Sequence, residues 1–249
     1  MHATDYTLIT GASSGMGEAT AKLLSTSRNL VLHGRDEARL AAVGEACARN
    51  GADVALFPFD LEKADTVGAA LTELLKARAL PVEAFVHFAG MTEVLPMAKT
   101  KYSVGLRVMN VNYFSAAEII SALLKKKVNG QSLRNILLTS SIAVITGKKY
   151  QPHYCGSKGA INALGITLAN ELAPNIRVNV IAPGSFPTRI VQTTFVDAPL
   201  DGSWNPSTLL HPGTVDDVAR IVRFLISEDA SYLTGQIINV DGGEHFPHF

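Results

Sequence analysis

The sequence has little cysteine, no excess of charge and no long apolar run, and each shortage excludes a class of protein. Its 249 residues include only two cysteines, Cys47 and Cys155, so neither a disulfide framework nor a metal site built on cysteine pairs is expected. His245 and His248 stand three residues apart without a third ligand, so we expect no metal site there either. Basic and acidic residues number 22 each, which argues against nucleic acid or an anionic membrane as a partner.

Two further absences bear on where the protein works. No apolar stretch reaches the roughly 18 residues that a membrane-spanning helix needs. The first residues, 1–5, lack the basic and apolar regions of a secretory signal. We therefore expect a cytoplasmic protein whose cysteines are reduced. Because 47% of its residues are hydrophobic, the chain can enclose one large core, and we expect residues 1–249 to form a single domain.

Short strand-like runs alternate with longer helical patterns along the whole chain. Strands are expected near residues 6–10, 29–33, 53–57, 84–87, 135–139, 177–181 and 237–240. Helices are expected near residues 16–27, 37–50, 64–77, 111–127, 154–173 and 215–227. Such alternation is typical of a parallel sheet with helices on both faces. The sequence therefore predicts an α/β fold with a doubly wound, seven-stranded parallel sheet.

A glycine-rich loop, Thr10–Gly17, follows the first predicted strand. Gly11 permits a tight turn, Gly15 lets the main chain approach a pyrophosphate, and Gly17 allows close packing of helix on sheet. Main-chain N–H groups at the start of the helix would hold the phosphate charge. The spacing differs from the commoner Gly-x-Gly-x-x-Gly fingerprint. The loop predicts a dinucleotide site whose residues include Gly11, Ser13, Ser14, Gly15, Met16 and Gly17.

The end of the second predicted strand indicates which nucleotide binds. In NAD sites an acidic residue there meets the ribose 2′-hydroxyl, whereas an arginine accommodates the 2′-phosphate of NADP. This strand ends in Arg35, and the first carboxylate is Asp36. Arg35 would stack on the phosphate or grip it with its planar guanidinium, with Ser13 and Ser14 as hydrogen-bond donors. The alternative is a surface arginine paired with Asp36 or Glu37. We expect NADP(H) to be favoured over NAD(H).

Tyr154 and Lys158 form the most specific catalytic pattern in the chain. Four residues apart on a helix, they share one face, so the ammonium can lie near the phenol. Alone the spacing is weak evidence, because a half-buried tyrosine beside a surface lysine is an ordinary arrangement. Ser141 lies thirteen residues before Tyr154, and Asn112 lies between the glycine loop and Ser141. Together with the glycine loop, the set indicates a carbonyl reductase.

These residues resemble the short-chain dehydrogenase/reductase family over nearly the whole chain. The matching features are the Thr10–Gly17 loop, Asp60-Leu61, Ala89-Gly90, Asn112, Ser141, Tyr154 with Lys158, Pro183-Gly184 with Thr188, and the last strand with its exit at 239–243. Within the family the chain is similar to 3-oxoacyl-carrier-protein reductases. The resemblance implies a Rossmann-type sheet with helices on both faces.

The resemblance also implies which residues contact the nucleotide. Asp60-Leu61 would meet the adenine, and Ala89-Gly90 would lie beside the adenosine. Pro183-Gly184 and Thr188 would meet the nicotinamide amide and a nearby phosphate. Tyr154 and Lys158 complete the expected cofactor contacts, Lys158 by holding the nicotinamide ribose.

The implied mechanism gives each catalytic residue a task. Tyr154 would donate a proton to the carbonyl oxygen. Lys158 and an oxidised nicotinamide, both cationic, would lower the pKa of that phenol from about 10 toward neutrality. Ser141 would donate a hydrogen bond to the substrate oxygen, with Ser140 as the alternative register. Asn112 would anchor a water that links Lys158 to solvent. In the four-residue catalytic set, Asn112, Ser141, Tyr154 and Lys158, each group thus has a distinct function.

The sequence departs from the family pattern at one place. The fourth strand of the family normally ends Asn-Asn-Ala-Gly, whereas this chain reads His87-Phe88-Ala89-Gly90. His87 can still form a hydrogen bond where an asparagine would brace the sheet, and we favour that structural role over a second catalytic one.

A long segment, 184–212, follows the sixth predicted strand and interrupts the alternation. It contains four prolines and several large apolar residues. We expect a substrate lid, because it leaves the carboxyl edge of the sheet, where ligands of α/β proteins bind. The alternative is an irregular patch that packs on the core or on a second subunit. Phe186 and Trp204 are expected to contact the substrate together with Ser141 and Tyr154.

The leading functional hypothesis is an NADPH-dependent reductase of a ketone or aldehyde, with a 3-oxoacyl thioester as one candidate. An acyl-carrier protein could dock on Lys125–Lys127, although Asn170 stands where such reductases carry a second basic residue. The alternatives are an NADP-binding sensor or scaffold without turnover, and physiological oxidation of an alcohol. We expect a homo-oligomer, a tetramer or a dimer, with Phe246 and Phe249 packing against another subunit.

Overall fold

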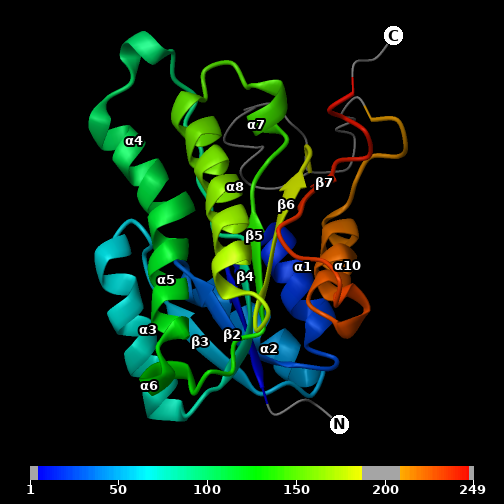
Figure 1. Ribbon diagram of the computed structural model, residues 1–249. Helices are drawn as coiled ribbons and strands as arrows, with labels where there is room; N and C mark the ends of the chain where they lie inside the picture. The colour runs from blue at the N-terminus through cyan, green and yellow to red at the C-terminus, as the bar shows by residue number, and fades with distance from the viewer. Residues whose placement is uncertain (1–4, 187–207, 247–249) are drawn as a thin grey trace.

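A single parallel sheet of seven strands organises the protein (Figure 1). The computed structural model describes residues 5–186 and 208–246. The strand order is β3-β2-β1-β4-β5-β6-β7, with every pair parallel. The strands are β1 (Tyr6–Thr10), β2 (Asn29–Gly34), β3 (Val54–Pro58), β4 (Val82–His87), β5 (Asn135–Thr139), β6 (Arg177–Pro183) and β7 (Ile237–Val240). The predicted doubly wound, seven-stranded α/β fold is confirmed.

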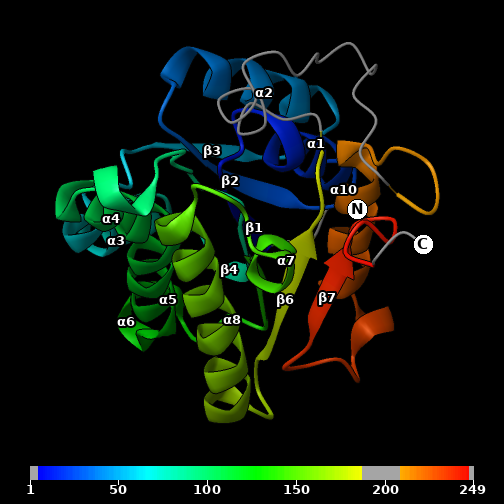
Figure 2. The same cartoon turned by 90° about the horizontal axis from the view of Figure 1, so that it is seen from above.

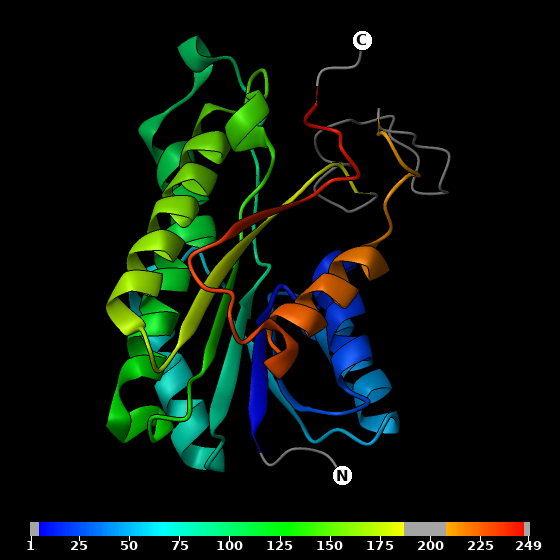
Figure 3. The same cartoon turned by 45° about the vertical axis from the view of Figure 1, so that its right-hand side comes forward.

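Helices cover both faces of the sheet, as Figures 2 and 3 show. One face carries α1 (Gly15–Leu24), α2 (Glu37–Arg49) and α10 (Val215–Leu225). The other carries α3 (Ala64–Arg78), α5 (Ser115–Leu124) and α8 (Pro152–Leu172). Shorter helical segments are η1 (Met97–Lys99), α4 (Tyr102–Met109), η2 (Asn110–Phe114), α6 (Lys126–Asn129), α7 (Ala143–Thr146) and η3 (Glu228–Ala230). Within the described ranges, no helix combines the length and apolarity that crossing a membrane requires.

The two layers of helices enclose two hydrophobic clusters, one on each face of the sheet. Leu24, Leu40 and Val222 meet strand residues on the first face. Ile119 and Ile161 do so on the second face. Because both of their faces are covered, β1 and β5 are buried along their whole length.

The middle of the chain differs from the sequence-based assignment. The predicted helix over 111–127 is three elements: the π-helical turn η2, then α5, which ends at Leu124, and then α6. In η2 the N–H of Ser115 bonds the carbonyl of Asn110, one residue further back than in an α-helix. α4 has no counterpart in the prediction. Hydrophobic periodicity alone does not reveal an extra residue within a helix, so it did not predict the π-helical turn.

The reversal of strand order beside β1 positions the functional site. The chain passes from β1 to β2 on one side, and after β3 it crosses to β4 on the other side of β1. Diverging connections leave a crevice outside the carboxyl ends of the strands at such a switch point. Of the predicted lid 184–212, only 184–186 and 208–212 are described, and the sequence-based assignments of Thr188 and Trp204 lie outside the described residues.

Two buried histidines lie at or near the carboxyl ends of β4 and β2, the strands that flank β1. His87 is fully buried at the end of β4, and its Nδ1 lies 2.9 Å from Oγ1 of Thr10. His33 is buried near the end of β2, with Nε2 3.1 Å from the carbonyl oxygen of Phe59. Burial lowers the pKa of His87 to about 3 and that of His33 to about 4. The contact with Thr10 is the bracing expected of His87.

We predict that these histidines make the fold sensitive to acid. Histidine in the unfolded chain titrates near pH 6.5. Below that pH the unfolded chain therefore binds protons at positions where the buried histidines of the native protein stay neutral. Each buried histidine should then cost about 1.4 kcal/mol of stability per pH unit, until its folded pKa is reached. Because the unfolded histidine is only half protonated at pH 6.5, the free energy of unfolding in urea should fall by roughly 3 kcal/mol for the two together between pH 6.5 and 5.

Other groups also titrate in this range, so a variant isolates the effect of one histidine. His87→Asn replaces the imidazole with a side-chain amide that can still form a hydrogen bond with Thr10. It should remove about half of the stability that is lost in acid. His211→Asn, at an exposed histidine, should leave the loss unchanged. An unaltered pH dependence in His87→Asn would show that the buried imidazole is not its source.

Candidate active site

Two adjoining cavities open along the carboxyl edge of the sheet. The first, of about 680 Å³, is lined by the glycine loop and the ends of β2 and β3, and we call it the loop cavity. The second, of about 510 Å³, is lined by the ends of β5 and β6 and the start of α8, and we call it the tyrosine cavity. Met16, Phe88, Gly90 and Thr92 line both, so the two cavities share a wall.

The glycine loop is shaped by close main-chain contacts. Gly11 has φ +69°, and a side chain there would lie 2.8 Å from the nitrogen of Ala89. A Cβ on Gly17 would lie 2.2 Å from the carbonyl oxygen of Gly11. No larger residue fits either position, so α1 begins directly against the turn. The side chain of Ser14, the N-cap of α1, makes no capping bond. The N–H groups at this helix start can therefore receive a phosphate.

The predicted cofactor residues fall into the two cavities according to their place on the sheet. Those lining the loop cavity are Gly11, Ser13, Ser14, Gly15, Met16, Gly17, Arg35, Asp60, Leu61, Ala89 and Gly90. Those lining the tyrosine cavity are Met16, Gly90, Tyr154, Lys158, Pro183 and Gly184. An elongated dinucleotide could thus lie with one end in each.

Near the end of β2, the carboxylate of Asp36 pairs with Arg39 and not with Arg35. Arg39 forms a 2.7 Å ion pair with Asp36, whose side chain also caps α2. Arg35 is exposed and lines the loop cavity. The alternative pairing of Arg35 with Asp36 is therefore not the one observed. Ser13 lies close by, since a Cβ on Gly34 would meet its side chain at 3.0 Å.

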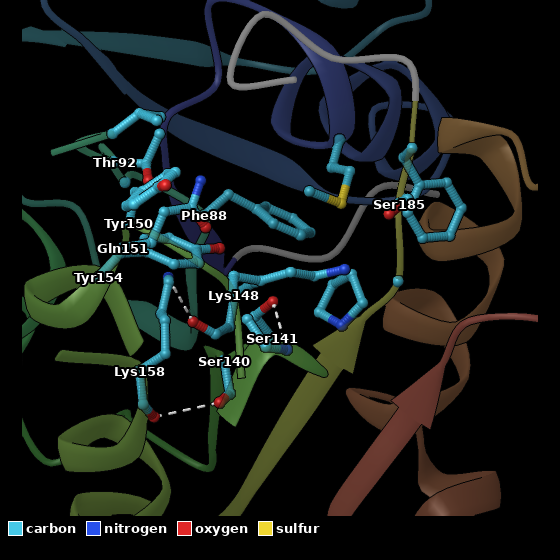
Figure 4. Close-up of a pocket in the computed structure, with 18 of the residues that line it drawn as sticks. Phe88, Thr92, Ser140, Ser141, Lys148, Tyr150, Gln151, Tyr154, Lys158 and Ser185 are labelled. Carbon is cyan, nitrogen blue, oxygen red and sulfur yellow. Dashed lines mark hydrogen bonds between the residues drawn. The ribbon is translucent and has the colours of Figure 1, made fainter. Parts of the chain in front are cut away.

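Tyr154 and Lys158 face the tyrosine cavity from the first turns of α8 (Figure 4). The ammonium of Lys158 lies 5.9 Å from the centre of the Tyr154 ring. It donates a 2.7 Å hydrogen bond to the carbonyl of Thr139, the last residue of β5. Lys158 is 3% exposed, and among the described residues this carbonyl is the hydrogen-bond partner of its ammonium.

Burial governs the pKa values of this pair. It raises the pKa of the Tyr154 phenol, and the Ser141 side chain, as a hydrogen-bond partner, lowers it in part. Burial also lowers the pKa of Lys158 to about 8, so the ammonium is still largely charged at neutral pH. Among the protein's own groups, desolvation of Tyr154 outweighs the hydrogen bond with Ser141. The expected lowering of the phenol pKa by Lys158 together with an oxidised nicotinamide stays a prediction.

The two serines after β5 have different environments. Ser140 is buried, and its hydroxyl donates a 3.1 Å hydrogen bond to the carbonyl of Lys158, which ties β5 to α8. Ser141 is half-buried, accepts from the N–H of Ala143 at 3.1 Å and lines the tyrosine cavity. The structure thus gives Ser140 a bracing contact and leaves the Ser141 hydroxyl beside the phenol.

Asn112 lies in the π-helical turn η2 and braces the site from beneath. Its Oδ1 accepts from the N–H of Met91 at 2.8 Å, and its Nδ2 donates to the carbonyl of Met91 and to Oγ of Ser157. These bonds use both amide N–H groups, so the side chain joins the segment after β4 to α8. Gly90 lies between Asn112 and Lys158, since a Cβ there would be 3.5 Å from Oδ1 and 3.6 Å from Nζ.

Sequence reasoning missed one residue that supports the tyrosine cavity and one that lines it. Glu93 is buried, and its Oε1 accepts from the N–H groups of His153 and Tyr154 at 2.7 and 3.2 Å, so it caps the catalytic helix. Its sixty-residue separation from α8 left no local signal. Gln151 is 6% exposed and lines the cavity one turn before Tyr154. The i, i+3 spacing could have indicated it.

The fold and the site together define a class of protein. A doubly wound sheet, a glycine loop at its switch point and a tyrosine–lysine pair beside it are the parts of an NAD(P)-binding oxidoreductase. A family model described as Enoyl-(Acyl carrier protein) reductase matches residues 11–245. The chain belongs to the short-chain dehydrogenase/reductase family, an oxidoreductase family whose members act on alcohols and carbonyls.

Relatives with different names are similar to almost the whole chain. A glucose 1-dehydrogenase of Gluconobacter oxydans is 34% identical over 245 residues, covering 95% of this chain and 90% of that protein. A 3-oxoacyl-[acyl-carrier-protein] reductase of Chlamydia trachomatis is 30% identical, covering 95% of each. The solved structure of a levodione reductase superposes with a TM-score of 0.83 at 26% identity, covering 98% of this chain and 99% of that one.

Proposed function

We propose that the protein is an NADPH-dependent reductase that converts a ketone or aldehyde to an alcohol. One observation carries the proposal: Ser141, Tyr154 and Lys158 line one cavity, and that cavity shares a wall with the loop cavity. A reducible carbonyl in the tyrosine cavity would lie beside a proton donor and next to the nucleotide site. The hydride for the carbonyl carbon is supplied by the bound nicotinamide.

The protein's own residues would manage the proton and the carbonyl oxygen. Because burial raises its pKa, Tyr154 holds its proton at neutral pH and can donate it to the oxygen. Ser141 would share the oxygen through its hydroxyl. The Lys158 ammonium stabilises the phenolate that remains and would hold the nicotinamide ribose. Asn112 is proposed to anchor the water that resupplies the proton, through its main chain, because its side-chain N–H groups are engaged elsewhere.

The observed pairing near β2 supports NADP(H) over NAD(H). The first carboxylate after β2, Asp36, is held by Arg39, while the Arg35 guanidinium is exposed at the loop cavity. Planar guanidinium groups bind phosphate through paired N–H donors. A 2′-phosphate would therefore find a cation and the nearby Ser13 hydroxyl. The nucleotide choice also favours reduction over alcohol oxidation as the physiological direction.

The substrate proposal is a ketone, with 3-oxoacyl thioesters among the candidates because several relatives carry that name. Within one subunit, α6 and its lysines lie at the opposite end of the sheet from α7 and the tyrosine cavity (Figure 1), which does not favour a carrier protein docked there. A sensor without turnover is disfavoured by the intact tyrosine–lysine–serine arrangement. The cytoplasm remains the proposed location.

Assembly into a homo-oligomer, a tetramer or dimer, is also proposed. Large apolar side chains on α4 and η2 are exposed: Tyr102 by 82%, Leu106 by 39% and Phe114 by 42%. Phe246 near the C-terminus is 53% exposed. Exposed groups of large apolar side chains are typical of surfaces that pack against another protein.

Removal of the phenol tests the catalytic assignment. Tyr154→Phe should lower kcat for ketone reduction by about 10²- to 10⁴-fold, the range typical of a lost general acid, and leave the Kd for NADPH unchanged. Tyr150→Phe is the matched control, because Tyr150 lines the same cavity and should retain activity within about twofold. Steady-state NADPH oxidation provides the measurement. A Tyr154→Phe enzyme with more than about a tenth of the wild-type kcat would contradict the assignment.

The nucleotide preference has its own test. Titration by intrinsic fluorescence should show tighter binding of NADPH than of NADH. Arg35→Leu should weaken NADPH at least about tenfold and leave NADH nearly unchanged, because the lost contact is to the 2′-phosphate. Arg49→Leu, at the far end of α2, should change neither. Tighter binding of NADH to the wild-type protein would refute the preference.

A further inference from the structure

The charged side chains that line the tyrosine cavity all carry one sign. Among the described residues they are Lys148, Lys149 and Lys158, and no aspartate or glutamate lines the cavity in that part of the chain. The loop cavity differs, since it is lined by both signs: Arg35, Arg39, Arg107, Asp36, Asp60 and Glu62. A concave site lined by one sign concentrates ligands of the opposite charge. The local bias stands out in a chain whose net charge is zero.

Lys158 does not account for this bias alone. Its ammonium is buried against the Thr139 carbonyl and is required at the phenol. Lys148 and Lys149 lie instead in the loop that follows α7, at the outer part of the cavity. Figure 4 shows the Lys148 side chain passing Ser141 toward the side of the cavity where Ser185 lies. A substrate held at Ser141 can therefore extend toward the Lys148 ammonium.

Lys148 forms only a loose ion pair, with Glu244. Its Nζ lies 3.8 Å from Oε1 of Glu244, with 39% of the lysine side chain exposed. That carboxylate already accepts two 2.6 Å hydrogen bonds, from the N–H and the hydroxyl of Ser185. A partly exposed pair at this distance gains little energy, so an anionic ligand could take the ammonium without a large loss. The carboxylate meanwhile stays with Ser185.

The other neighbouring charges do not cancel the bias. Lys149 lies 5.0 Å from the centre of the Tyr150 ring and has no ion pair among the described residues. Glu93, the buried carboxylate near the start of α8, is directed at the N–H groups of His153 and Tyr154 and does not line the cavity. Between the lysines and the phenol the wall is apolar, with Phe88, Val94 and Phe186.

We infer that the substrate is an anionic ketone, an oxo acid whose carboxylate is separated from the reacting carbonyl by an apolar body and is received by Lys148 at the mouth of the tyrosine cavity. Lys149 adds to the field there. The inference rests on the proposed function, which places the reacting carbonyl at Ser141 and Tyr154. It assigns Lys148 as a specificity-determining residue and sets this substrate class apart from neutral sugars and diketones.

A matched pair of rigid ketones tests the inference. 4-Acetylbenzoate and 4-acetylbenzamide have nearly the same shape and differ at one end, where a carboxylate stands in place of a neutral amide. The ratio of their kcat/KM values should be at least tenfold in favour of the carboxylate in dilute buffer. It should shrink in 0.5 M salt, because ions screen an exposed ammonium. 4-Acetylphenyl phosphate in parallel reports whether a phosphate serves in place of the carboxylate; a phosphate preferred over the carboxylate would overturn the assignment of an oxo acid.

Two variants distinguish recognition from mere support of the loop. Lys148→Gln should remove most of the preference for the carboxylate, with kcat for the neutral amide and KM for NADPH unchanged. Glu244→Gln keeps an oxygen for Ser185 but frees Lys148, so it should increase the preference. Opposite signs are expected only if the ammonium itself binds the anion. Lys126→Gln, on α6, is the control and should leave the ratio unchanged.

The outcomes separate this inference from the proposed function. Equal kcat/KM for the acid and the amide, or a preference that survives Lys148→Gln, would overturn the inference and leave the reductase intact. Failure to reduce any ketone would count against the proposed function. In that case calorimetric binding of benzoate and benzamide to the protein saturated with NADP+ still decides the charge preference, with tighter binding of benzoate expected and equal binding overturning it.

Discussion

The buried ammonium of Lys158 is the constraint around which the site is arranged. An ion that is 3% exposed needs close polar support, and the last carbonyl of β5 supplies it at 2.7 Å. That bond fixes α8 against the end of the sheet, and the Ser140 hydroxyl strengthens the same junction from the other side. Asn112 and Glu93 then hold the first turns of α8 from the segments that follow β4. Together these contacts place Tyr154.

The same arrangement explains why two cavities share one wall. Gly11 and Gly17 bring α1 so close to the turn after β1 that the main chain forms the floor of the loop cavity. Phe88 and Gly90, which follow β4, separate it from the tyrosine cavity while lining both. A dinucleotide that extends from the loop cavity past this wall into the tyrosine cavity would bring its hydride donor beside a bound carbonyl, away from bulk water. The neighbouring positive charge of Lys148 gives the second cavity its polarity.

The sequence predicted the seven strands and the doubly wound parallel sheet, because apolar runs that alternate with helical periodicity carry that information directly. It also predicted the glycine loop and the Tyr154–Lys158 pair, since both are local patterns. The π-helical turn at Asn112 and the Glu93 cap were not predictable, because one depends on an inserted residue and the other on a contact sixty residues away. The rise that burial causes in the Tyr154 pKa was also not predictable, since the sequence shows a neighbouring lysine but not how completely the phenol is desolvated.

The central claim is that a carbonyl in the tyrosine cavity receives hydride from a nucleotide held in the loop cavity. Single-turnover reduction of a ketone with NADPH deuterated at the transferable position of C4 tests this claim most directly, with mass spectrometry of the product alcohol. The account predicts one deuterium on the carbinol carbon for each NADPH consumed, with a single face of the nicotinamide as donor. Tight NADPH binding without deuterium transfer to any ketone would contradict it and would favour a nucleotide sensor.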